Sequence, residues 1–435
     1  MAGLTAARAL AEAGLRVLVV EAQQRIGGRI LTQHIGGEAI ELGAEFIHGR
    51  PPELWALIDE IGLETYERDG AQVCFEDGAL ADCGDAMDAT FEPLEKLKNF
   101  EGPDISFAEY LDREKLPEDD RQRIIGYVEG FNAADHRVVS AAALGAQQKA
   151  EDAIGSDHNY RLRGGYDQLP AYLAQQIADR GGRVVTGAVV KEIRWQHGRV
   201  KIATDAGNFE AGKAIVTLPL GVLQRGEVRI SPPPEAVMEA AGRLRTGQVR
   251  RFTLLFRERF WRSLTPQPAL RALSFLFAFS EMPPVWWTTH PEASRTLTGW
   301  VGGPRSEAFA DLNAEGLGQR ACAALTRIFG IGQSTLHDLL EGCYTHDWQQ
   351  DPFAFGAYSY VAAGGLGASK AMTVPVEETL FFAGEHTDIT GHWGTVHAAM
   401  RSGLRAAEQV IDLAGTPAAT PGEGRGGTMT AQAAS

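Results

Sequence analysis

An acidic residue at the end of an apolar run is the first candidate for chemistry in this chain. Glu21 follows Leu15–Val20, whose leucine and valine residues predict a short β-strand. A carboxylate at the end of such a strand can accept hydrogen bonds from the hydroxyls of an adenosine ribose. Gly27, Gly28 and Arg29 then form a turn whose N–H groups and guanidinium can bind phosphate oxygens. The alternative is a plain hairpin turn with an exposed arginine, but its place just after Glu21 favours phosphate binding.

A helix precedes this strand and completes half of a nucleotide-binding motif. Ala2–Ala13 is rich in alanine and leucine, so it predicts a helix that Gly14 ends. Helix, turn, strand and terminal acid form the second half of a dinucleotide-binding βαβ unit. Of the G-x-G-x-x-G fingerprint only the last glycine, Gly3, is present, and the strand before it is missing. We therefore expect this chain to bind a dinucleotide weakly, and a version extended upstream by a strand with G-x-G to bind it better.

A second constellation lies near the other end of the sequence. The apolar run Leu380–Ala383 predicts a strand that leads into Gly384 and Glu385, and Gly394, Thr395 and Val396 then open a long helix. The start of a helix has free N–H donors and the positive end of its dipole. These suit the pyrimidine end of an isoalloxazine ring, where negative charge gathers on reduction. The alternative is an ordinary strand–loop–helix connection.

Composition limits the class of protein. The 435 residues suffice for about two or three domains, and 44% hydrophobic with 22% charged residues are typical of a soluble globular protein. A net charge of −15 argues against nucleic acid as the main partner. The four cysteines show no C-x-x-C spacing, which predicts reduced thiols and a cytoplasmic location. We find no signal peptide and no membrane-spanning apolar stretch, so no membrane partner and no metal site are expected.

Four segments carry a family resemblance. MAGL, VVEA, RIGGRI and ELGAEFIHG, in this order and spacing, resemble flavin-dependent amine oxidases, a group that includes monoamine oxidases, polyamine oxidases and histone lysine demethylases. ELGAEFIHG is most similar to the polyamine oxidase version. The resemblance covers nearly the whole chain. It implies an α/β fold in which an FAD-binding Rossmann-like domain, here without its first strand, carries an inserted α+β substrate domain.

The resemblance also divides the chain into alternating segments. The FAD domain is expected from residues 1–70, 161–235 and 371–412, the substrate domain from 71–160 (mainly helical) and 236–370 (mainly sheet), and a disordered tail from 413–435. Apolar runs at 183–195, 214–218, 250–261, 272–279 and 295–303 predict strands within these segments.

Candidate site residues follow from the same resemblance. The cofactor-binding set comprises Gly3, Glu21, Gly28, Arg29, Ala44, Glu45, Val190, Glu385, Gly394, Thr395 and Val396. In it the backbone of Val190 would bind the adenine, although an ordinary buried strand valine is the alternative. Glu385 would contact the ribityl–pyrophosphate region. The catalytic set comprises Arg251, Tyr358, His392 and Trp393.

Three of these positions depart from the family pattern or leave a choice open. Many members have a lysine that holds a water near flavin N5, and the matching position here is Arg251, which could hold a water or be a surface arginine. Tyr358 would lie at the flavin face. The residue before it, Ala357, stands where mammalian monoamine oxidases have a flavin-linked cysteine, so we expect non-covalent FAD. Either His392 or Trp393 would complete an aromatic wall.

The expected reaction is oxidation of an amine. A substrate C–H next to nitrogen would give hydride to the flavin, the imine would hydrolyse, and molecular oxygen would reoxidise the flavin and yield hydrogen peroxide. Glu45 and His48 could bind a second cationic group, as in a polyamine, or only support the backbone. The alternatives are a related flavoenzyme such as an amino acid oxidase or a desaturase, a non-catalytic protein that has lost the cofactor, and a recorded start that is too late.

Overall fold

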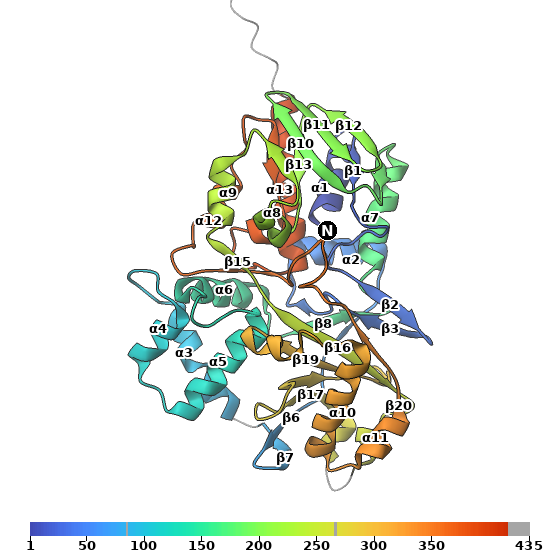
Figure 1. Cartoon of the computed structure of the whole chain (residues 1–435), viewed down its shortest axis with the longest axis vertical. Helices are drawn as coiled ribbons and strands as arrows, with labels where there is room; N and C mark the ends of the chain where they lie inside the picture. Colours follow the sequence, from blue (N-terminus) through green and yellow to red (C-terminus); the bar gives the residue numbers. More distant parts are fainter. Residues whose placement is uncertain (84–85, 265–267, 416–435) are drawn as a thin grey trace, which may run out of the picture.

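The computed structural model describes residues 1–83, 86–264 and 268–415 (Figure 1). Small sheets with helices α1 (Ala2–Glu12) and α13 (Val396–Gly415) occupy the upper part of Figure 1, and a large sheet with α10 (Ala314–Phe329) occupies the lower part. The tail predicted from residue 413 is wrong at its start, because α13 continues to Gly415. The remainder of that tail, 416–435, lies outside the described residues.

Two pairs of short parallel strands form what we call the parallel-strand half, together with α1 and α13. Strand β1 (Leu18–Val20) pairs with β9 (Arg183–Val185), and β13 (Ala214–Val216) pairs with β22 (Leu380–Phe382). Among the strands that the structure describes, β1 and β13 each have a single hydrogen-bonded neighbour, so the two pairs do not join into one sheet. Helices α1 and α13 pack closely, since a Cβ on Gly403 would lie 2.3 Å from the carbonyl oxygen of Ala2.

The predicted helix and strand at the start of the chain are confirmed, with one shift. The strand begins at Leu18 rather than at Leu15. The N–H of Leu15 instead donates to the carbonyl of Leu10 at 3.0 Å, and that of Gly14 to Ala11 at 3.0 Å. These bonds satisfy carbonyls at the end of α1, so the chain becomes extended only after them.

The remaining elements around these strands are short. The run at 183–195 gives β9 and the start of a four-stranded sheet in the order β12-β11-β10-β14. Its strands are β10 (Val190–Gln196), β11 (Arg199–Thr204), β12 (Gly207–Ala211) and β14 (Arg229–Ser231). The helices are α2 (Pro52–Ile61), α7 (Gln168–Asp179), α8 (Leu220–Arg225), α9 (Glu235–Ala241), α12 (Ala368–Met372) and the 3₁₀ turn η4 (Glu385–Thr387). Smaller pairings join β2 (Thr32–Ile35) with β3 (Glu38–Glu41), β4 (Ile47–His48) and β5 (Thr65–Glu67) with β8 (Asn159–Leu162), and β15 (Leu244–Thr246) with β21 (Ser359–Val361).

A seven-stranded sheet dominates the other half, in the order β20-β16-β19-β18-β17-β6-β7. Every residue of β16 (Val249–Phe256) is buried, and helix α10 packs on this sheet through residues such as Leu317 and Leu325. The predicted strands at 250–261, 272–279 and 295–303 are confirmed as β16, β17 and β19. The other elements here are β17 (Leu273–Phe277), β18 (Val285–Trp287), β19 (Thr296–Gly302), β20 (Leu340–Thr345), α11 (Gln333–Leu339), and the 3₁₀ turns η1 (Phe260–Ser263), η2 (Pro268–Ala272) and η3 (Pro304–Phe309).

The segment expected to be mainly helical contains two strands of that sheet. Its helices are α3 (Ala86–Leu97), α4 (Phe107–Glu114), α5 (Glu118–Asn132) and α6 (Ala141–Ile154), which group together in Figure 1. Before them, β6 (Ala71–Glu76) runs parallel to β17 and pairs with β7 (Ala79–Asp82). Val73 and Phe75 of β6 are buried in the core of the large sheet, a long-range pairing that local sequence pattern does not report.

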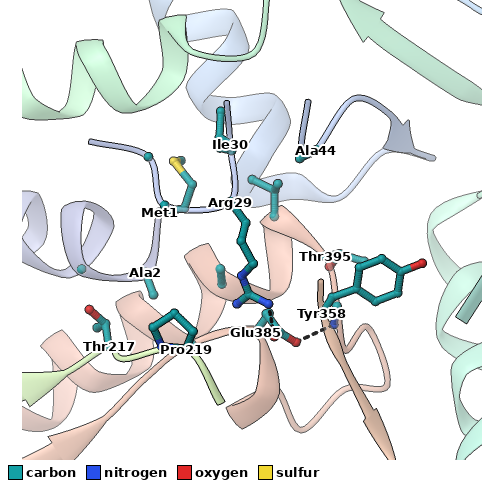
Figure 2. A pocket seen from close by; sticks show the side chains of 18 of the residues that line it. Met1, Ala2, Arg29, Ile30, Ala44, Thr217, Pro219, Tyr358, Glu385 and Thr395 are labelled. Atoms are coloured by element: carbon teal, nitrogen blue, oxygen red, sulfur yellow. Dashed lines mark hydrogen bonds and ion pairs between the residues drawn. The ribbon is translucent and has the colours of Figure 1, made fainter. Parts of the chain in front are cut away.

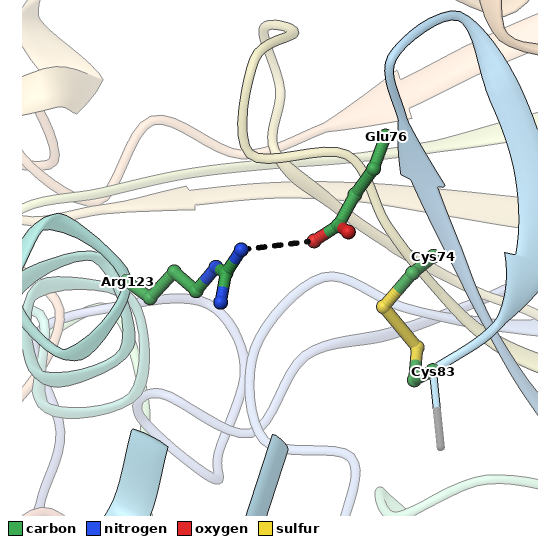
Figure 3. Close-up of a disulfide and its surroundings, with 4 residues drawn as sticks. All are labelled: Cys74, Glu76, Cys83 and Arg123. Carbon is green, nitrogen blue, oxygen red and sulfur yellow. Dashed lines mark ion pairs between the residues drawn. A yellow bond between two sulfur atoms is a disulfide. The ribbon is translucent and has the colours of Figure 1, made fainter. Parts of the chain in front are cut away.

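The prediction that all four cysteines are reduced is wrong for two of them. Cys74 on β6 and Cys83 just after β7 form a disulfide, with their Cα atoms 5.0 Å apart (Figure 3). The β6–β7 hairpin brings them together across a separation of nine residues, which a search for C-x-x-C does not detect. Cys322 and Cys343 are free. Reduced cysteines therefore no longer support the predicted cytoplasmic location. In the described part of the chain, every helix is too short or too polar to cross a membrane.

Candidate active site

One large cavity runs between the two halves of the molecule. Its volume is about 1840 Å³, well above the ~300–1,000 Å³ of ordinary small-molecule sites. At one end it is bordered by β1, β13 and the first turn of α1, and at the other by α5, α6 and β17. All eleven predicted cofactor-binding residues line it: Gly3, Glu21, Gly28, Arg29, Ala44, Glu45, Val190, Glu385, Gly394, Thr395 and Val396.

The first end of the cavity contains the predicted ribose acceptor. The carboxylate of Glu21 accepts a hydrogen bond from the N–H of Gln23 at 2.9 Å, and burial raises its pKa. Val190 opens β10 on the same lining. Gly3 lies where α1 approaches the chain after β13, since a Cβ there would meet Thr217 Oγ1 at 3.0 Å. The glycine thus permits a close approach of helix and strand end beside the cavity.

Glu385 is the centre of the site's polar network (Figure 2). Its carboxylate forms an ion pair with Arg29 at 2.8 Å and accepts hydrogen bonds from Ser359 and from the N–H of Gly394 at 2.9 Å. Arg29 also donates to the carbonyl oxygen of Ala357 at 2.7 Å. Burial alone would raise the pKa of Glu385, but Arg29, His386 and Ser359 together hold it below its usual value. Segments from three distant parts of the sequence are thereby fixed around the cavity.

Two residues at the start of α13, Gly394 and Thr395, leave open space and define the backbone geometry there. Thr395 Oγ1 accepts a hydrogen bond from the N–H of Ala398 at 3.1 Å and donates to the carbonyl of His392 at 2.8 Å. Gly394 has φ +82°, and a Cβ there would meet the Tyr358 ring at 2.9 Å. Side-chain bulk is therefore excluded where the helix dipole is most positive.

Of the two candidate wall residues His392 and Trp393, only Trp393 lines the cavity. Tyr358 lines the cavity and its hydroxyl donates to the carbonyl of Phe131 at 2.6 Å. Trp393 lines it too, with Nε1 donating to the carbonyl of Asp388 at 2.8 Å. His392 does not line it: its ring bonds the carbonyl of Ala150 at 3.0 Å and the Thr390 hydroxyl at 2.9 Å. Of the predicted catalytic residues, Tyr358 and Trp393 therefore line the cavity while His392 does not, and Ala357 is also on the lining.

Arg251 is not a surface arginine. It is 4% exposed, donates to the carbonyl of Gly43 at 2.6 Å and pairs with Glu45. Glu45 pairs with Arg161 as well and accepts a hydrogen bond from Trp287 Nε1 at 3.1 Å. Two guanidinium groups therefore already neutralise this carboxylate, which weighs against its binding a cationic substrate group. Its neighbour His48 also lines the cavity, and burial lowers the pKa of His48 to about 4, so its ring is neutral.

The far end of the cavity is an aromatic chamber that the sequence did not reveal as a site. We define the chamber by its rings and two charged side chains: Tyr127, Phe131, Phe275, Phe277, Phe279, Trp287, Trp300, Arg68 and Glu151. Phe275, Phe277 and Phe279 alternate along one apolar run, and this spacing of two was the available signal that they share one face. Arg68 and Glu151 gave no signal, because their positions belong to no motif.

These residues fit an elongated dinucleotide cofactor. The half-buried Glu21 carboxylate suits ribose hydroxyls, Arg29 and the start of α13 offer positive charge, and Gly394 leaves room against Tyr358. The chamber beyond Tyr358 and Trp393 leaves space for a second molecule. In the part of the chain that the structure describes, the one group of metal-ligand type is Glu129, Asp135 and His136, which lie outside this cavity.

Comparisons with known proteins agree with this reading. The chain is 30% identical over 444 residues to Lysine-specific histone demethylase 1 homolog 2 of Oryza sativa subsp. japonica, covering 94% of this chain and 56% of the relative. It is 28% identical over 442 residues to Polyamine oxidase 2 of Arabidopsis thaliana, covering 93% and 85%. The chain thus spans little more than half the length of this demethylase relative.

Solved structures with this fold include two amine oxidases. Wild-type putrescine oxidase bound to putrescine matches with a TM-score of 0.80 and 23% identity, covering 94% of this chain and 97% of that one. Cyclohexylamine oxidase from Brevibacterium oxydans IH-35A matches with a TM-score of 0.80 and 21% identity, covering 95% and 97%. The expected fold class is therefore confirmed. A family model described as flavin containing amine oxidoreductase matches residues 1–411. The chain belongs to the family of flavin-containing amine oxidoreductases.

Proposed function

We propose that this protein oxidises a small-molecule amine to an imine with non-covalent FAD as cofactor, and that molecular oxygen is reduced to hydrogen peroxide. The observation that carries the proposal is the place of Tyr358, Trp393 and the start of α13. All three lie on one continuous cavity, between the end with Glu21 and the aromatic chamber. A flavin ring held there would separate a nucleotide-binding end from a substrate-binding end.

The residues of the chain would bind, orient and exclude water. Bound FAD supplies the electron acceptor for the substrate C–H bond and passes the electrons to oxygen. Tyr358 and Trp393 present ring faces that align a neutral amine without adding a charge. Their polar atoms are already bonded to Phe131 and Asp388, so the rings are fixed before substrate arrives. Arg251 bonds to Glu45 and to the carbonyl of Gly43, and these contacts keep this part of the cavity lining in place.

Relatives support an amine substrate but leave its size open. Their names include polyamine oxidases and lysine-specific histone demethylases, and the matched structures include a putrescine oxidase. We propose a small-molecule substrate because the chamber is lined by rings packed against one another, such as Trp287 and Trp300 at 5.7 Å between centroids. We propose no nucleic-acid or membrane partner, in keeping with the net charge of −15.

The experiment begins with the protein purified in added FAD and a visible spectrum. Flavin absorbance near ~450 nm that amines bleach without oxygen, and peroxide formation on aeration, are expected. Tyr358→Ala should slow the bleaching while FAD content is kept. The control is Tyr172→Ala, since Tyr172 lies outside the cavity and bonds Glu60. FAD that binds but is bleached by no amine would overturn the proposal.

The mode of flavin attachment has its own test. Because Ala357 has no thiol, acid precipitation should release all of the yellow colour into the supernatant. Colour that stays with the precipitated protein would contradict non-covalent binding.

A further inference from the structure

An arginine without an ionic partner faces the aromatic chamber. Arg68 follows β5, lines the cavity and is partly buried. Its guanidinium donates one hydrogen bond to the hydroxyl of Ser274 at 3.2 Å and lies over the Phe275 ring at 4.4 Å from the centroid. Among the described residues no carboxylate forms an ion pair with it. Since a guanidinium has five N–H donors, most of them are free for a ligand.

Three other arginines near the chamber have carboxylate partners within the protein. Arg161 and Arg251 share Glu45, and Arg250 pairs with Asp347 at 2.6 Å. Asp69, the acid next to Arg68 in sequence, uses its carboxylate to accept the N–H of Gly70 at 2.6 Å. His48 beside Arg68 is neutral. Arg68 therefore stands at this wall of the chamber without an ion-pair partner among the described residues.

A carboxylate marks another wall. Glu151 on α6 accepts a hydrogen bond from Gln147 at 2.7 Å, and burial raises its pKa to about 7. Its acidic neighbour Asp152 is paired with Lys98 at 2.6 Å. A series of ring contacts leads from this side towards Arg68: Tyr127 stacks on Phe131 at 5.6 Å, and Phe131 meets His48 at 5.7 Å. The chamber thus has a guanidinium on one wall and a carboxyl group on another, with aromatic rings between them.

We propose that Arg68 binds a carboxylate of the substrate, so that the preferred substrate is an amine that also carries a carboxylate and an apolar side chain, such as an aromatic amino acid. The inference rests on the proposed amine oxidation and specifies its substrate class. A planar guanidinium can bind a carboxylate through two parallel hydrogen bonds, and the Phe275 ring holds its plane in place. A polyamine would instead bring several positive charges next to Arg68.

The test compares three substrates that differ in charge. Phenylalanine and phenethylamine differ only in the carboxylate, and putrescine carries two cationic groups. For the FAD-loaded wild type we expect kcat/KM to be highest for phenylalanine. Arg68→Met keeps the length of the side chain and removes its charge, so it should lower kcat/KM for phenylalanine by about 30-fold or more, mainly through KM. Phenethylamine should change by less than about threefold, and putrescine should improve.

Two further variants separate charge from geometry and from folding. Arg68→Lys keeps the charge but not the planar fork, so an intermediate loss is expected with phenylalanine. Arg243→Met removes an exposed arginine that pairs with Glu239, far from the lining, and should leave all three substrates unchanged. The melting temperature and FAD content of each variant report on folding.

A binding measurement keeps this inference distinct from the proposed function. Phenylacetate, which has the carboxylate and ring but no amine, should quench the fluorescence of Trp287 and Trp300 in the wild type and bind about 30-fold more weakly to Arg68→Met. If this holds while no amine reduces the flavin, the anion site stands and the oxidase proposal fails. If phenylacetate binds both proteins equally, or if Arg68→Met affects phenylalanine and phenethylamine alike, Arg68 is not an anion-binding residue.

Discussion

The two halves of this molecule border the same cavity but are stabilised in different ways. In the seven-stranded sheet, all eight residues of β16 are buried, and they pair with β19 on one side and β20 on the other. In the parallel-strand half, β1 has three residues and pairs with β9 alone among the described strands, and Leu18 is 39% exposed. One half is thus a sheet over one large hydrophobic core, whereas the other combines smaller core clusters with a polar network around the cavity.

The largest expected effect comes from the network that holds the parallel-strand half together. Glu385→Ala would leave Arg29 without its partner and remove the acceptor for Gly394 and Ser359. Breaking a buried ion pair by removing one partner costs about 3–5 kcal/mol, so the free energy of unfolding should fall by that amount and FAD content should drop. Chemical denaturation and bound flavin per chain measure both.

An exposed ion pair on the large sheet provides the control. Glu341 on β20 pairs with Arg295 at 3.0 Å, and both side chains are about one-third exposed. Glu341→Ala should cost less than about 1 kcal/mol and leave FAD content unchanged. Equal losses from the two variants would show that Glu385 is no more important than a surface pair.

The comparison explains which parts could be predicted from the sequence. That Glu21, Glu385 and Gly394 line one cavity could be predicted, because cofactor motifs require a residue type at a fixed place next to a strand or helix end. Sequence position alone could not show whether His392 or Trp393 faces the cavity. His392 is turned to the carbonyl of Ala150, 242 residues away, and this contact exists only in the folded chain. The ion pairs of Glu45 could not be predicted either, because Arg161 and Arg251 come together on it only in the folded chain.

The strands β17 and β6 of the large sheet differ in the same way: local sequence predicts the first, and only a distant contact explains the second. The strand β17 was predicted because its run of apolar residues indicates a strand without any information from elsewhere in the chain. β6 was not, because its strand conformation depends on a parallel pairing with β17, about 200 residues later in the sequence. The disulfide was missed with it, since the Cys74–Cys83 contact follows from the hairpin that β6 begins.

Because the parallel-strand half borders the cavity, it should respond locally to FAD. At a free concentration of one hundred times Kd, FAD should stabilise the protein by about 2.7 kcal/mol. Hydrogen exchange should slow in peptides that cover β1 and β13, whose residues line the cavity. Exchange in β16 should change little, because its backbone is already paired on both edges. Equal protection of β1 and β16 would contradict the contrast between the halves.

The acid at the end of β3, Glu41, should make stability depend on pH. Glu41 accepts hydrogen bonds from Thr32 and from the N–H of Tyr166, each at 2.7 Å, and burial raises its pKa to about 8. Since the folded-state pKa lies above the unfolded value, the contribution of Glu41 is full below about pH 4.5 and is lost as the pH rises through 8.

Glu41→Gln removes this titration while it keeps the shape of the side chain. Between pH 5 and 7 the wild type should lose about 2.5 kcal/mol of unfolding free energy relative to the variant, because each pH unit between the unfolded and folded pKa values costs about 1.4 kcal/mol. Denaturation curves at four pH values measure the difference, in which all other titrating groups cancel. Parallel pH profiles for the two proteins would show that Glu41 is not buried as an acid.

The smallest expected effect concerns the disulfide at the edge of the seven-stranded sheet (Figure 3). Cys74→Ser opens a loop of nine residues, for which chain entropy sets an upper limit of about 2.7 kcal/mol. We expect a loss of only about 1–2 kcal/mol, because β6 remains paired with β17 and Val73 and Phe75 stay in the core.

Wild-type protein in a reducing agent should melt at the same temperature as the variant. Cys322→Ala removes a free thiol and leaves the disulfide, so the reducing agent should still lower the melting temperature of this variant. Four titratable thiols in the native oxidised protein, rather than two, would disprove the bond and restore the expectation of reduced cysteines.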